Sequence, residues 1–228
     1  MKRTRLLFGL CCLLAICSLP LKAQDNRNMY LRWGIMAGLN GYNAHTLNLS
    51  DDRGRYGFNL AARAELSFTD APSRMYLDAE LGLLKLGWKD GQAGYAIDAL
   101  RFPGHGTMVP SAYSHPYWDV YSLHLPIHIG YRWAVARGLA IYADAGPYVS
   151  FGLSGKLKYT DPVTGTKLSE NVFHVMRRFD WGLGVRLGAE IANHLRIGAA
   201  YDFGLMNNMR GGMGSGNNNF TVSVGYMF

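Results

Sequence analysis

Apolar side chains recur at every second position in eight segments of this chain, and a helical period is nearly absent. In residues 179–191 the odd positions are Phe, Trp, Leu, Val, Leu, Ala and Ile, and the even positions are Asp, Gly, Gly, Arg, Gly and Glu. A period of two is typical of a β-strand whose two faces meet different surroundings. The other segments lie at 31–40, 56–68, 75–83, 121–132, 139–153, 195–204 and 220–228. The chain is therefore predicted to be all-β.

The connections between these segments alternate between long and short. The long ones are 41–55, 89–116, 154–170 and 206–218, and the short ones are 70–74, 134–138 and 192–194. This alternation places every long connection on one side and both ends of the chain on the other. An even number of strands near ~9–11 residues each, joined in this way, is typical of a barrel that crosses a membrane. We predict an eight-stranded antiparallel up-and-down transmembrane β-barrel with short periplasmic turns and long extracellular loops.

The two faces of the strands predict which one points to lipid. An eight-stranded barrel is only just wide enough to be filled by its own side chains. A lining of glycines with a few long charged residues suits that interior, whereas an inward apolar face would crowd it with tryptophans and leucines. The charged residues assigned to the interior are Arg32, Arg63, Arg132, Arg186, Arg196, Glu65, Asp78, Glu80, Asp144, Asp180, Glu190 and Asp202. Since buried ions must be paired, we expect a network that plugs the barrel.

Two features concern the closure of the sheet. The last strand must pair with the first, because open sheet edges are not tolerated in hydrocarbon. Pro126 and Pro147 lie inside predicted strands, where each removes one donor from the ladder. A closed barrel has no free edge to accommodate them, so we expect each proline to mark a β-bulge or to lie above the membrane core.

The start of the chain predicts export. Basic residues at positions 2, 3 and 5 precede an apolar run over 6–19, and Ala23 precedes a suitable cleavage site. This pattern predicts a secretory signal peptide over 1–23 and a mature β-barrel domain over 24–228. An uncleaved anchor is disfavoured because the run is shorter than the ~20 residues of a spanning helix. A lipoprotein modified at Cys17 is the other alternative.

The charge of the chain depends on that segment. The full chain has 23 Lys and Arg against 16 Asp and Glu, for a formal charge of +7. Without Lys2, Arg3, Arg5 and Lys22 the balance becomes 19 against 16, or +3. A charge this small gives weak support for a polyanionic partner, and we predict no nucleic-acid binding. All three cysteines also lie in the predicted signal peptide, so the mature chain relies on no disulfide.

The histidines and serines do not form a recognisable site. His124 and His128 lie four residues apart on one strand face, roughly 13 Å apart at ~3.3 Å per residue, which is too far to share an ion. Ser122, His124 and Ser150 have the residue types of a lipid-modifying enzyme, but no base and orienting acid accompany them at a suitable spacing. We predict no catalytic residue, no metal site and no cofactor.

Three other motifs have structural interpretations. Asp78 and Glu80 have the residue types of an acid–base pair, but opposite charges are available to neutralise each one. His105 and His115 fall in the longest connection and are expected at the surface. The Gly211–Gly216 stretch resembles a phosphate-binding loop, yet it lacks the strand–loop–helix context that such a loop requires. We expect it to be an external loop.

Five stretches resemble the PorT-like, OmpA-type family of outer-membrane β-barrel proteins. They are VYSLHLPIHIGYRW at 120–133, GPYVSFGL at 146–153, FDWGLGVRLGAEI at 179–191, LRIGAAYDFGLMNN at 195–208 and VSVGYMF at 222–228. The resemblance implies residence in the outer membrane of a Gram-negative bacterium and no cofactor. It also implies that the barrel assembly machinery recognises the C-terminal strand, which ends at Phe228.

The function is less constrained than the fold, because barrels of this kind serve many roles. The first hypothesis is a structural or interaction protein, in secretion or surface assembly. Its outer surface contacts membrane lipid, and its extracellular loops, above all 89–116, contact a protein or glycan. The alternative is a narrow channel for small solutes or ions. A lipid-modifying enzyme is the third hypothesis and the weakest.

Overall fold

The computed structural model describes residues 29–46, 53–54, 56–89, 114–160, 165–174, 176–207 and 215–228. The strands are β1 (Tyr30–Thr46), β2 (Arg53–Gly54), β3 (Tyr56–Ser67), β4 (Arg74–Lys89), β5 (Ser114–Ala136), β6 (Leu139–Thr160), β7 (Lys167–Asn171), β8 (Phe179–Ile191), β9 (Leu195–Gly204) and β10 (Ser215–Met227). A short 3₁₀ helix, η1 (Val172–His174), precedes β8. Among these residues no helix has the length and apolarity to span a membrane.

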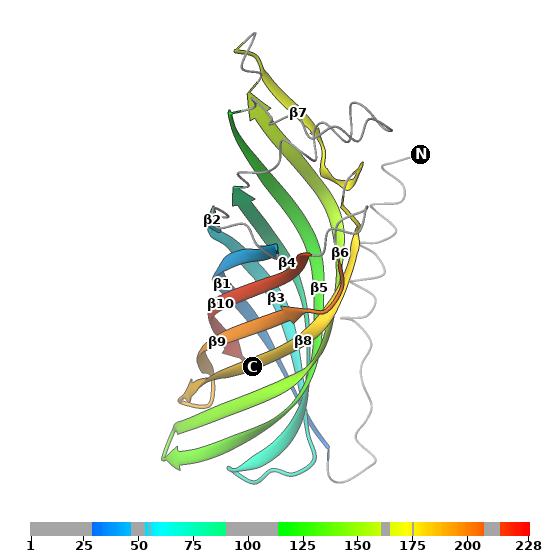
Figure 1. Cartoon of the computed structure of the whole chain (residues 1–228). Helices are drawn as coiled ribbons and strands as arrows, with labels where there is room; N and C mark the ends of the chain where they lie inside the picture. Colours follow the sequence, from blue (N-terminus) through cyan, green and yellow to red (C-terminus); the bar gives the residue numbers. More distant parts are fainter. Residues whose placement is uncertain are drawn as a thin grey trace, which may run out of the picture.

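Eight of the strands form a closed antiparallel ring (Figure 1). Their order is β4-β3-β1-β10-β9-β8-β6-β5, and pairing between β4 and β5 closes the ring. The last strand pairs with the first over a long register, from Gly34 opposite Met227 to Thr46 opposite Ser215. The predicted eight-stranded antiparallel barrel is confirmed, and so is the pairing of its two end strands.

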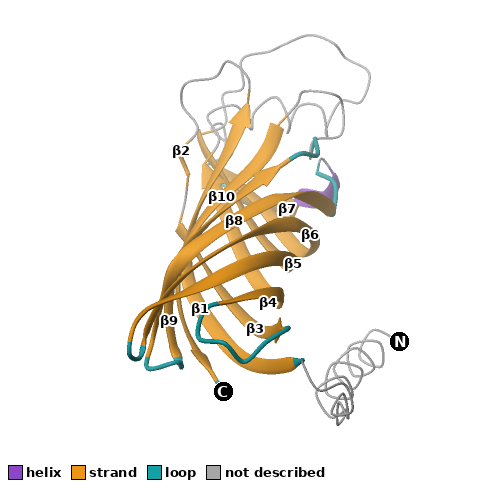
Figure 2. Cartoon of the chain, turned by 90° about the horizontal axis from the view of Figure 1, so that it is seen from below, coloured by secondary structure: helices purple, strands orange, loops and turns teal. Residues whose placement is uncertain are grey.

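The short turns gather at one end of the barrel, and the C-terminus lies at that same end (Figure 2). β8 and β9 have the predicted limits, and β3 differs by one residue. At the opposite end the strands are longer than predicted: β5 starts at Ser114 and β6 continues to Thr160. The period of two in the sequence indicates only the part of a strand that has one apolar face. The extensions of β5 and β6 lack this pattern and were therefore not predicted.

The predicted long connections are therefore partly wrong. Most of 154–170 is strand, because β6 runs to Thr160 and β7 folds back to pair with it. Residues 90–113 of the connection 89–116 lie outside the described residues, and so does His105. The predicted signal peptide over 1–23, positions 211–214 of the glycine stretch and parts of the other two long connections also lie outside them.

The outward and inward faces follow the predicted assignment. Trp181, Leu183 and Val185 of β8 are 44%, 50% and 44% exposed. Arg186 and Glu190 on the same strand are 7% and 0% exposed. Apolar side chains thus form the outer surface while charged ones fill the centre, which is the reverse of a water-soluble barrel and suits a hydrocarbon environment.

Glycines on the inner face make room for large neighbours. A Cβ on Gly188 would lie 2.6 Å from the Tyr142 hydroxyl, and one on Gly198 would lie 2.4 Å from the same atom. The buried Tyr142 ring therefore lies against two glycines that pair with each other on the neighbouring strands β8 and β9. This packing explains the glycines at positions 188 and 198.

Neither proline marks a bulge, so the first of the two alternatives expected for them was wrong. The register of β5 with β6 is the same before and after Pro126, and that of β6 with β8 is continuous through Pro147. Ladder pairs are missing beside each proline, between Pro126 and Ile129 of β5 and between Ala79 and Gly82 of β4. The lost donor interrupts the ladder locally, while the pairs on either side keep the register. Shifts occur elsewhere, including one between Tyr121 and Ser122.

Candidate functional site

The interior next to the short turns is filled by an ion-pair cluster. This turn-end cluster consists of Arg32, Arg74, Arg132, Arg196, Glu65 and Glu190. Glu190 accepts hydrogen bonds from Arg132 Nε at 3.0 Å and Arg196 Nε at 2.6 Å. Glu65 pairs with Arg196, and it lies 3.5 Å from nitrogens of both Arg32 and Arg74. Each of the two carboxylates thus pairs with three guanidinium groups.

The same arginines fix the turns. Arg132 donates to the carbonyl of Pro72 and, through Nη2, to Asn193 Oδ1 at 2.8 Å. Arg32 Nη2 donates to the Asn193 carbonyl at 2.8 Å. Asn193 has a φ of 61°, a left-handed conformation that asparagine tolerates better than most residues. The cluster therefore joins the 68–73 and 192–194 turns across the end of the barrel.

A second cluster fills the middle of the barrel. This central cluster consists of Arg63, Arg186, Asp78, Glu80, Asp144, His128 and Tyr76. Arg186 reaches Asp78 at 3.1 Å and Glu80 at 3.4 Å. Asp144 accepts a hydrogen bond from the Tyr76 hydroxyl at 2.8 Å and lies 2.7 Å from His128 Nδ1.

Tyr142 connects the two clusters. Its ring lies 5.7 Å from Arg63 Cζ of the central cluster and 4.9 Å from Arg196 Cζ of the turn-end cluster. Both distances are within the range of cation–π contacts. Arg63, Arg196, Tyr76, Tyr142 and His128 are among the largest fully buried side chains of the described residues. The predicted interior network is therefore present, and its members occupy the barrel cross-section in this half.

The interior at the end opposite the short turns contains fewer ion pairs among the described residues. A cavity there is lined by polar side chains, including Asn59, His124, Asp202, Asn219 and Thr221. Asn219 donates to Asp202 at 3.1 Å, and His124 Nε2 lies 3.6 Å from Asp202. Within the described structure, Asn59 Oδ1 and His124 Nδ1 are buried without a hydrogen-bond partner, as are Arg196 Nη1 and the Tyr142 hydroxyl nearer the short turns. Buried polar atoms of this kind are normally satisfied by internal water.

Residues around η1 cover the inner face of β6 at this end. Val172, Phe173 and Met176 are buried. A Cβ on Gly155 would lie 2.2 Å from Val172 Cγ1, and one on Gly152 would lie 2.4 Å from the Phe173 ring. Glycines on β6 thus accept the apolar side chains of η1. A small cavity lies beside them, lined by Ser122, Ser150, Asp180, Met176 and Asn217 among others.

Three strand segments extend the barrel sheet beyond β8, and residues 117–121 of β5 still pair with residues 85–89 of β4. We call this extension the platform; it consists of residues 114–121 of β5, 154–160 of β6 and all of β7. In Figure 1 it rises at the end opposite the short turns. Lys158 binds Asp119 at 3.5 Å on its surface, and the Lys158 ammonium lies 5.2 Å from the Tyr117 ring centroid.

The structure separates the residues that were considered for catalysis. Ser122 and Ser150 line the cavity beside η1, whereas His124 lines the other cavity. Ser150 donates to the Leu123 carbonyl at 3.2 Å. Asp78 and Glu80 both bind Arg186, as the structural interpretation of that pair predicted. In the described parts of the chain, no group of three His, Cys, Asp or Glu residues could hold a metal ion.

Sequence reasoning missed several members of the clusters. Arg74 joins Glu65 from the edge of a turn, where the period of two had already ended. His128 and Tyr76 lie on the polar face of their strands, so their inward position followed from the pattern. Asp144 was also predicted inside, but its contacts with Tyr76 and His128 were not, because they depend on the register between strands.

Similarity to known proteins agrees with this architecture. The family model for the outer membrane protein β-barrel domain matches residues 22–210. No curated protein matches the chain. Solved structures with a similar fold include neisserial surface protein A (NspA), at 11% identity and a TM-score of 0.47 over 88% of this chain and 98% of that one.

Two further structures are similar. One is Ail, the attachment invasion locus protein of Yersinia pestis, in complex with the heparin analogue sucrose octasulfate, at 12% identity and a TM-score of 0.45 over 87% and 99% of the two chains. The other is OprG of Pseudomonas aeruginosa, at 10% identity and a TM-score of 0.37 over 88% and 95%. Because each TM-score is below 0.5, none of these likenesses supports an inference here. The family match covers most of the chain and agrees with the closed ring and its apolar exterior: the chain belongs to the outer membrane β-barrel domain family, whose members reside in the Gram-negative outer membrane.

Proposed function

We propose that this protein is a closed outer-membrane barrel that acts as an interaction protein at the cell surface, in secretion or surface assembly, as its PorT-like motifs suggest. The platform is the observation that carries the proposal. Spanning the membrane requires strands of only ~9–11 residues, yet β5 and β6 have 23 and 22 residues. The extra length, with β7 added to it, builds a surface that the barrel itself does not need.

The paired interior supports a role other than conduction. The turn-end and central clusters bring charged side chains together across the barrel, and most of them are buried. An ion or solute that passed through would have to break several buried ion pairs, each strongly stabilised against loss of one partner. Ser122 and Ser150 line one cavity and His124 lines another, so we propose no enzymatic role for them.

Site-specific crosslinking tests the interaction role. A photoreactive amino acid at Ser169 of the platform, which is exposed, is compared with one at Arg137, which is exposed in a short turn at the other end. We expect discrete crosslinked products in living cells from position 169 and none of the same mass from position 137. The absence of products at 169, or the same products at both positions, would contradict the proposal.

Conductance measurements test the closed interior. In planar bilayers we expect the purified protein to give no steady current at neutral pH. A steady open pore in the wild type would favour the small-solute channel instead. The crosslinking result does not depend on this measurement, so the two parts of the proposal can fail separately.

We further propose that residues 1–23 are removed during export and that the assembly machinery recognises the strand ending at Phe228. The basic and apolar start of the sequence supports the first point. The apolar outward face of β10 supports the second. Mass spectrometry of the mature chain should give an N-terminus at Gln24. Deletion of Phe228 should lower the amount of assembled barrel, with Asn218→Ala as a control near the other end of the same strand.

A further inference from the structure

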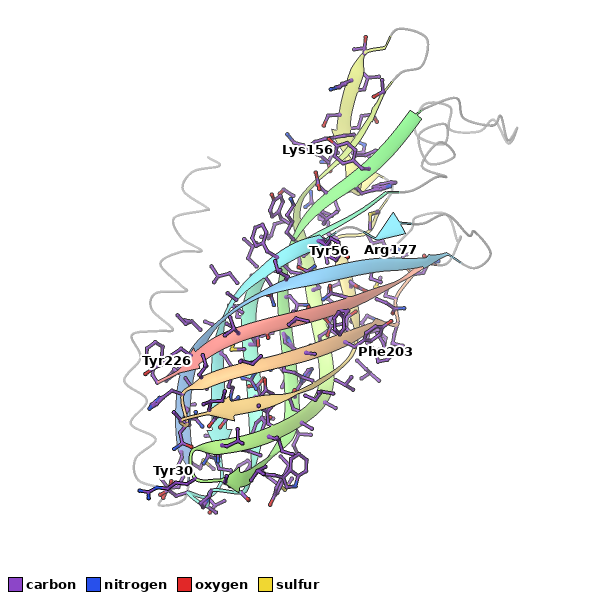
Figure 3. All side chains as sticks on the ribbon, turned by 90° about the vertical axis from the view of Figure 1, so that its left-hand side faces the viewer. Tyr30, Tyr56, Lys156, Arg177, Phe203 and Tyr226 are labelled. Atoms are coloured by element: carbon purple, nitrogen blue, oxygen red, sulfur yellow. The ribbon has the colours of Figure 1, made fainter. Side chains whose placement is uncertain are left out.

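A groove lies where the platform leaves the barrel wall. It has a volume of about 730 Å³, and its lining includes Tyr121, Leu153, Lys156, Lys158, Phe173 and Arg178. Ligand sites in proteins commonly measure ~300–1,000 Å³. Figure 3 shows Lys156 on the strand extension, above Tyr226 and Phe203 of the barrel wall. The groove is thus large enough for a ligand and lies on the outside of the protein.

The groove lies at the upper limit of the lipid-facing surface. Outward apolar residues on β6 continue through Val149 and Phe151 to Leu153, which are 40%, 48% and 48% exposed. Lys156 and Lys158 follow on the same strand. A register shift occurs at this level, since Tyr121 pairs with Ser154 while Ser122 pairs with Gly152, so Leu153 is the extra residue. Bulges often lie where a strand must redirect its side chains.

The neighbouring strands change at the same level. On β5 the outward apolar series ends at Leu123, and Tyr121 follows it. On β4, Lys85 faces Tyr121, and its ammonium lies 5.9 Å from the ring centroid. Tyrosines and lysines at this depth are typical of the interface between hydrocarbon and headgroups. The groove therefore opens at headgroup level in the outer leaflet.

Arg178 is held in place beside the groove. Its Nη1 donates to the carbonyls of Gly152 at 2.8 Å and Leu153 at 3.1 Å. Its Cζ lies 4.0 Å from the Phe173 ring centroid. These contacts fix the guanidinium plane while they use only one of its nitrogens. An arginine fixed in this way has donors left for an oxyanion.

The charges around the groove favour an anion. Asp119 and Glu170 also line it. Asp119 already binds Lys158 at 3.5 Å. Three cations therefore face two carboxylates in the lining, and Lys85 adds a fourth cation on the next strand.

We propose that this groove binds the phosphorylated headgroup of an outer-leaflet glycolipid of the lipid A type. Phosphate oxygens would meet Lys156, Lys158 and Arg178, because ammonium and guanidinium groups are the usual ligands of phosphate. The acyl chains would lie along Phe151 and Leu153, directly below. This proposal requires placement in the outer membrane and does not rest on the proposed interaction role of the platform.

Native mass spectrometry of the protein in lipid nanodiscs tests the site. The nanodiscs contain phosphatidylcholine with either lipid A or enzymatically dephosphorylated lipid A. The Lys156→Gln/Lys158→Gln variant is compared with Arg137→Gln/Lys167→Gln, which changes the net charge equally at exposed positions outside the groove. We expect lipid A binding to weaken about 25-fold in the first variant, since each lysine near an anionic surface contributes roughly fivefold. The control variant should bind as the wild type does.

Each other outcome overturns the proposal. Equal retention of lipid A by the two variants would show that the groove lysines are not the site. Equal binding of the dephosphorylated lipid would show that phosphate is not recognised. Full displacement of lipid A by millimolar inorganic phosphate would show that a free anion, and not the lipid, is the ligand. Circular dichroism of both variants establishes that the barrel is folded.

Discussion

The half of the barrel interior next to the short turns differs from the half below the platform in the number of its ion pairs. In the turn-end cluster, Glu65 and Glu190 each lie against three arginines. In the other half, Asp202 contacts only an amide and a histidine among the described residues. Two cavities lie there, and none of those described lies at the turn end. Ion pairs fill the first half, while the second half contains cavities that can hold water.

This difference agrees with the positions of the two halves in the membrane. The short turns face the periplasm in barrels of this family, so the half filled by ion pairs would separate the periplasm from the outside. The two cavities lie toward the end that carries the platform. The ion pairs are thus concentrated at the end with the short turns, and the polar cavities lie toward the other end.

The largest effect should come from breaking the turn-end cluster. Glu190→Gln leaves Arg32, Arg132 and Arg196 with one neutral partner in place of a buried carboxylate. We expect the free energy of unfolding to fall by about 3–5 kcal/mol, the usual cost of removing one member of a buried ion pair. Urea unfolding in lipid vesicles, followed by tryptophan fluorescence, measures the change.

The matched control is Glu80→Gln in the central cluster. Glu80 pairs with Arg186 at 3.4 Å, and Arg186 keeps Asp78 as a partner when Glu80 is neutral. We expect this variant to lose clearly less stability than Glu190→Gln. Equal losses in the free energy of unfolding from the two substitutions would mean that the turn-end cluster does not contribute more to stability than the central cluster does.

A second effect should come from the glycines around Tyr142. Gly198→Ala would place a Cβ 2.4 Å from the Tyr142 hydroxyl and 2.9 Å from the Leu187 carbonyl. We expect a loss of about 1–3 kcal/mol in the free energy of unfolding, as for other overpacked interiors. Gly41→Ala in β1 is the control, because nothing lies within 4 Å of the Cβ added there.

Tyr142→Phe sharpens the glycine measurement. Without the hydroxyl, the Cβ at position 198 loses its nearest neighbour, so the double variant should recover part of the stability lost by Gly198→Ala. If the two substitutions are simply additive, the ring of Tyr142 does not lie across Gly198 in the membrane. The Tyr142 ring would then not connect the two clusters.

Much of this fold could be predicted because the membrane imposes one simple rule on every strand. The alternation in 179–191 and 195–204 gave the limits of β8 and β9, since both strands face lipid along their length. The same alternation placed Arg63 and Asp78 inside, because a charged residue on the other face would lie in hydrocarbon.

The rest could not be predicted because it depends on register and on surroundings other than lipid. The sequence shows that Asp144 and His128 point inward, but only the pairing of β5 with β6 brings them within 2.7 Å. The platform lies beyond the lipid, so Lys156 and Lys158 have no apolar alternation to reveal a strand. Pro126 suggested a bulge, yet the pairs around it were sufficient to keep the register.

The smallest effect should come from Asp202→Asn in the half below the platform. Asp202 accepts a hydrogen bond from Asn219 at 3.1 Å, and an asparagine oxygen can accept it equally well. No arginine among the described residues loses an ion pair, so we expect a change of less than about 1 kcal/mol, typical of a single hydrogen bond. The same vesicle unfolding experiment measures it beside Glu190→Gln. A loss as large as that of Glu190→Gln would show that the half below the platform depends on its charged groups as much as the half next to the short turns does. The two halves would then not differ in this respect.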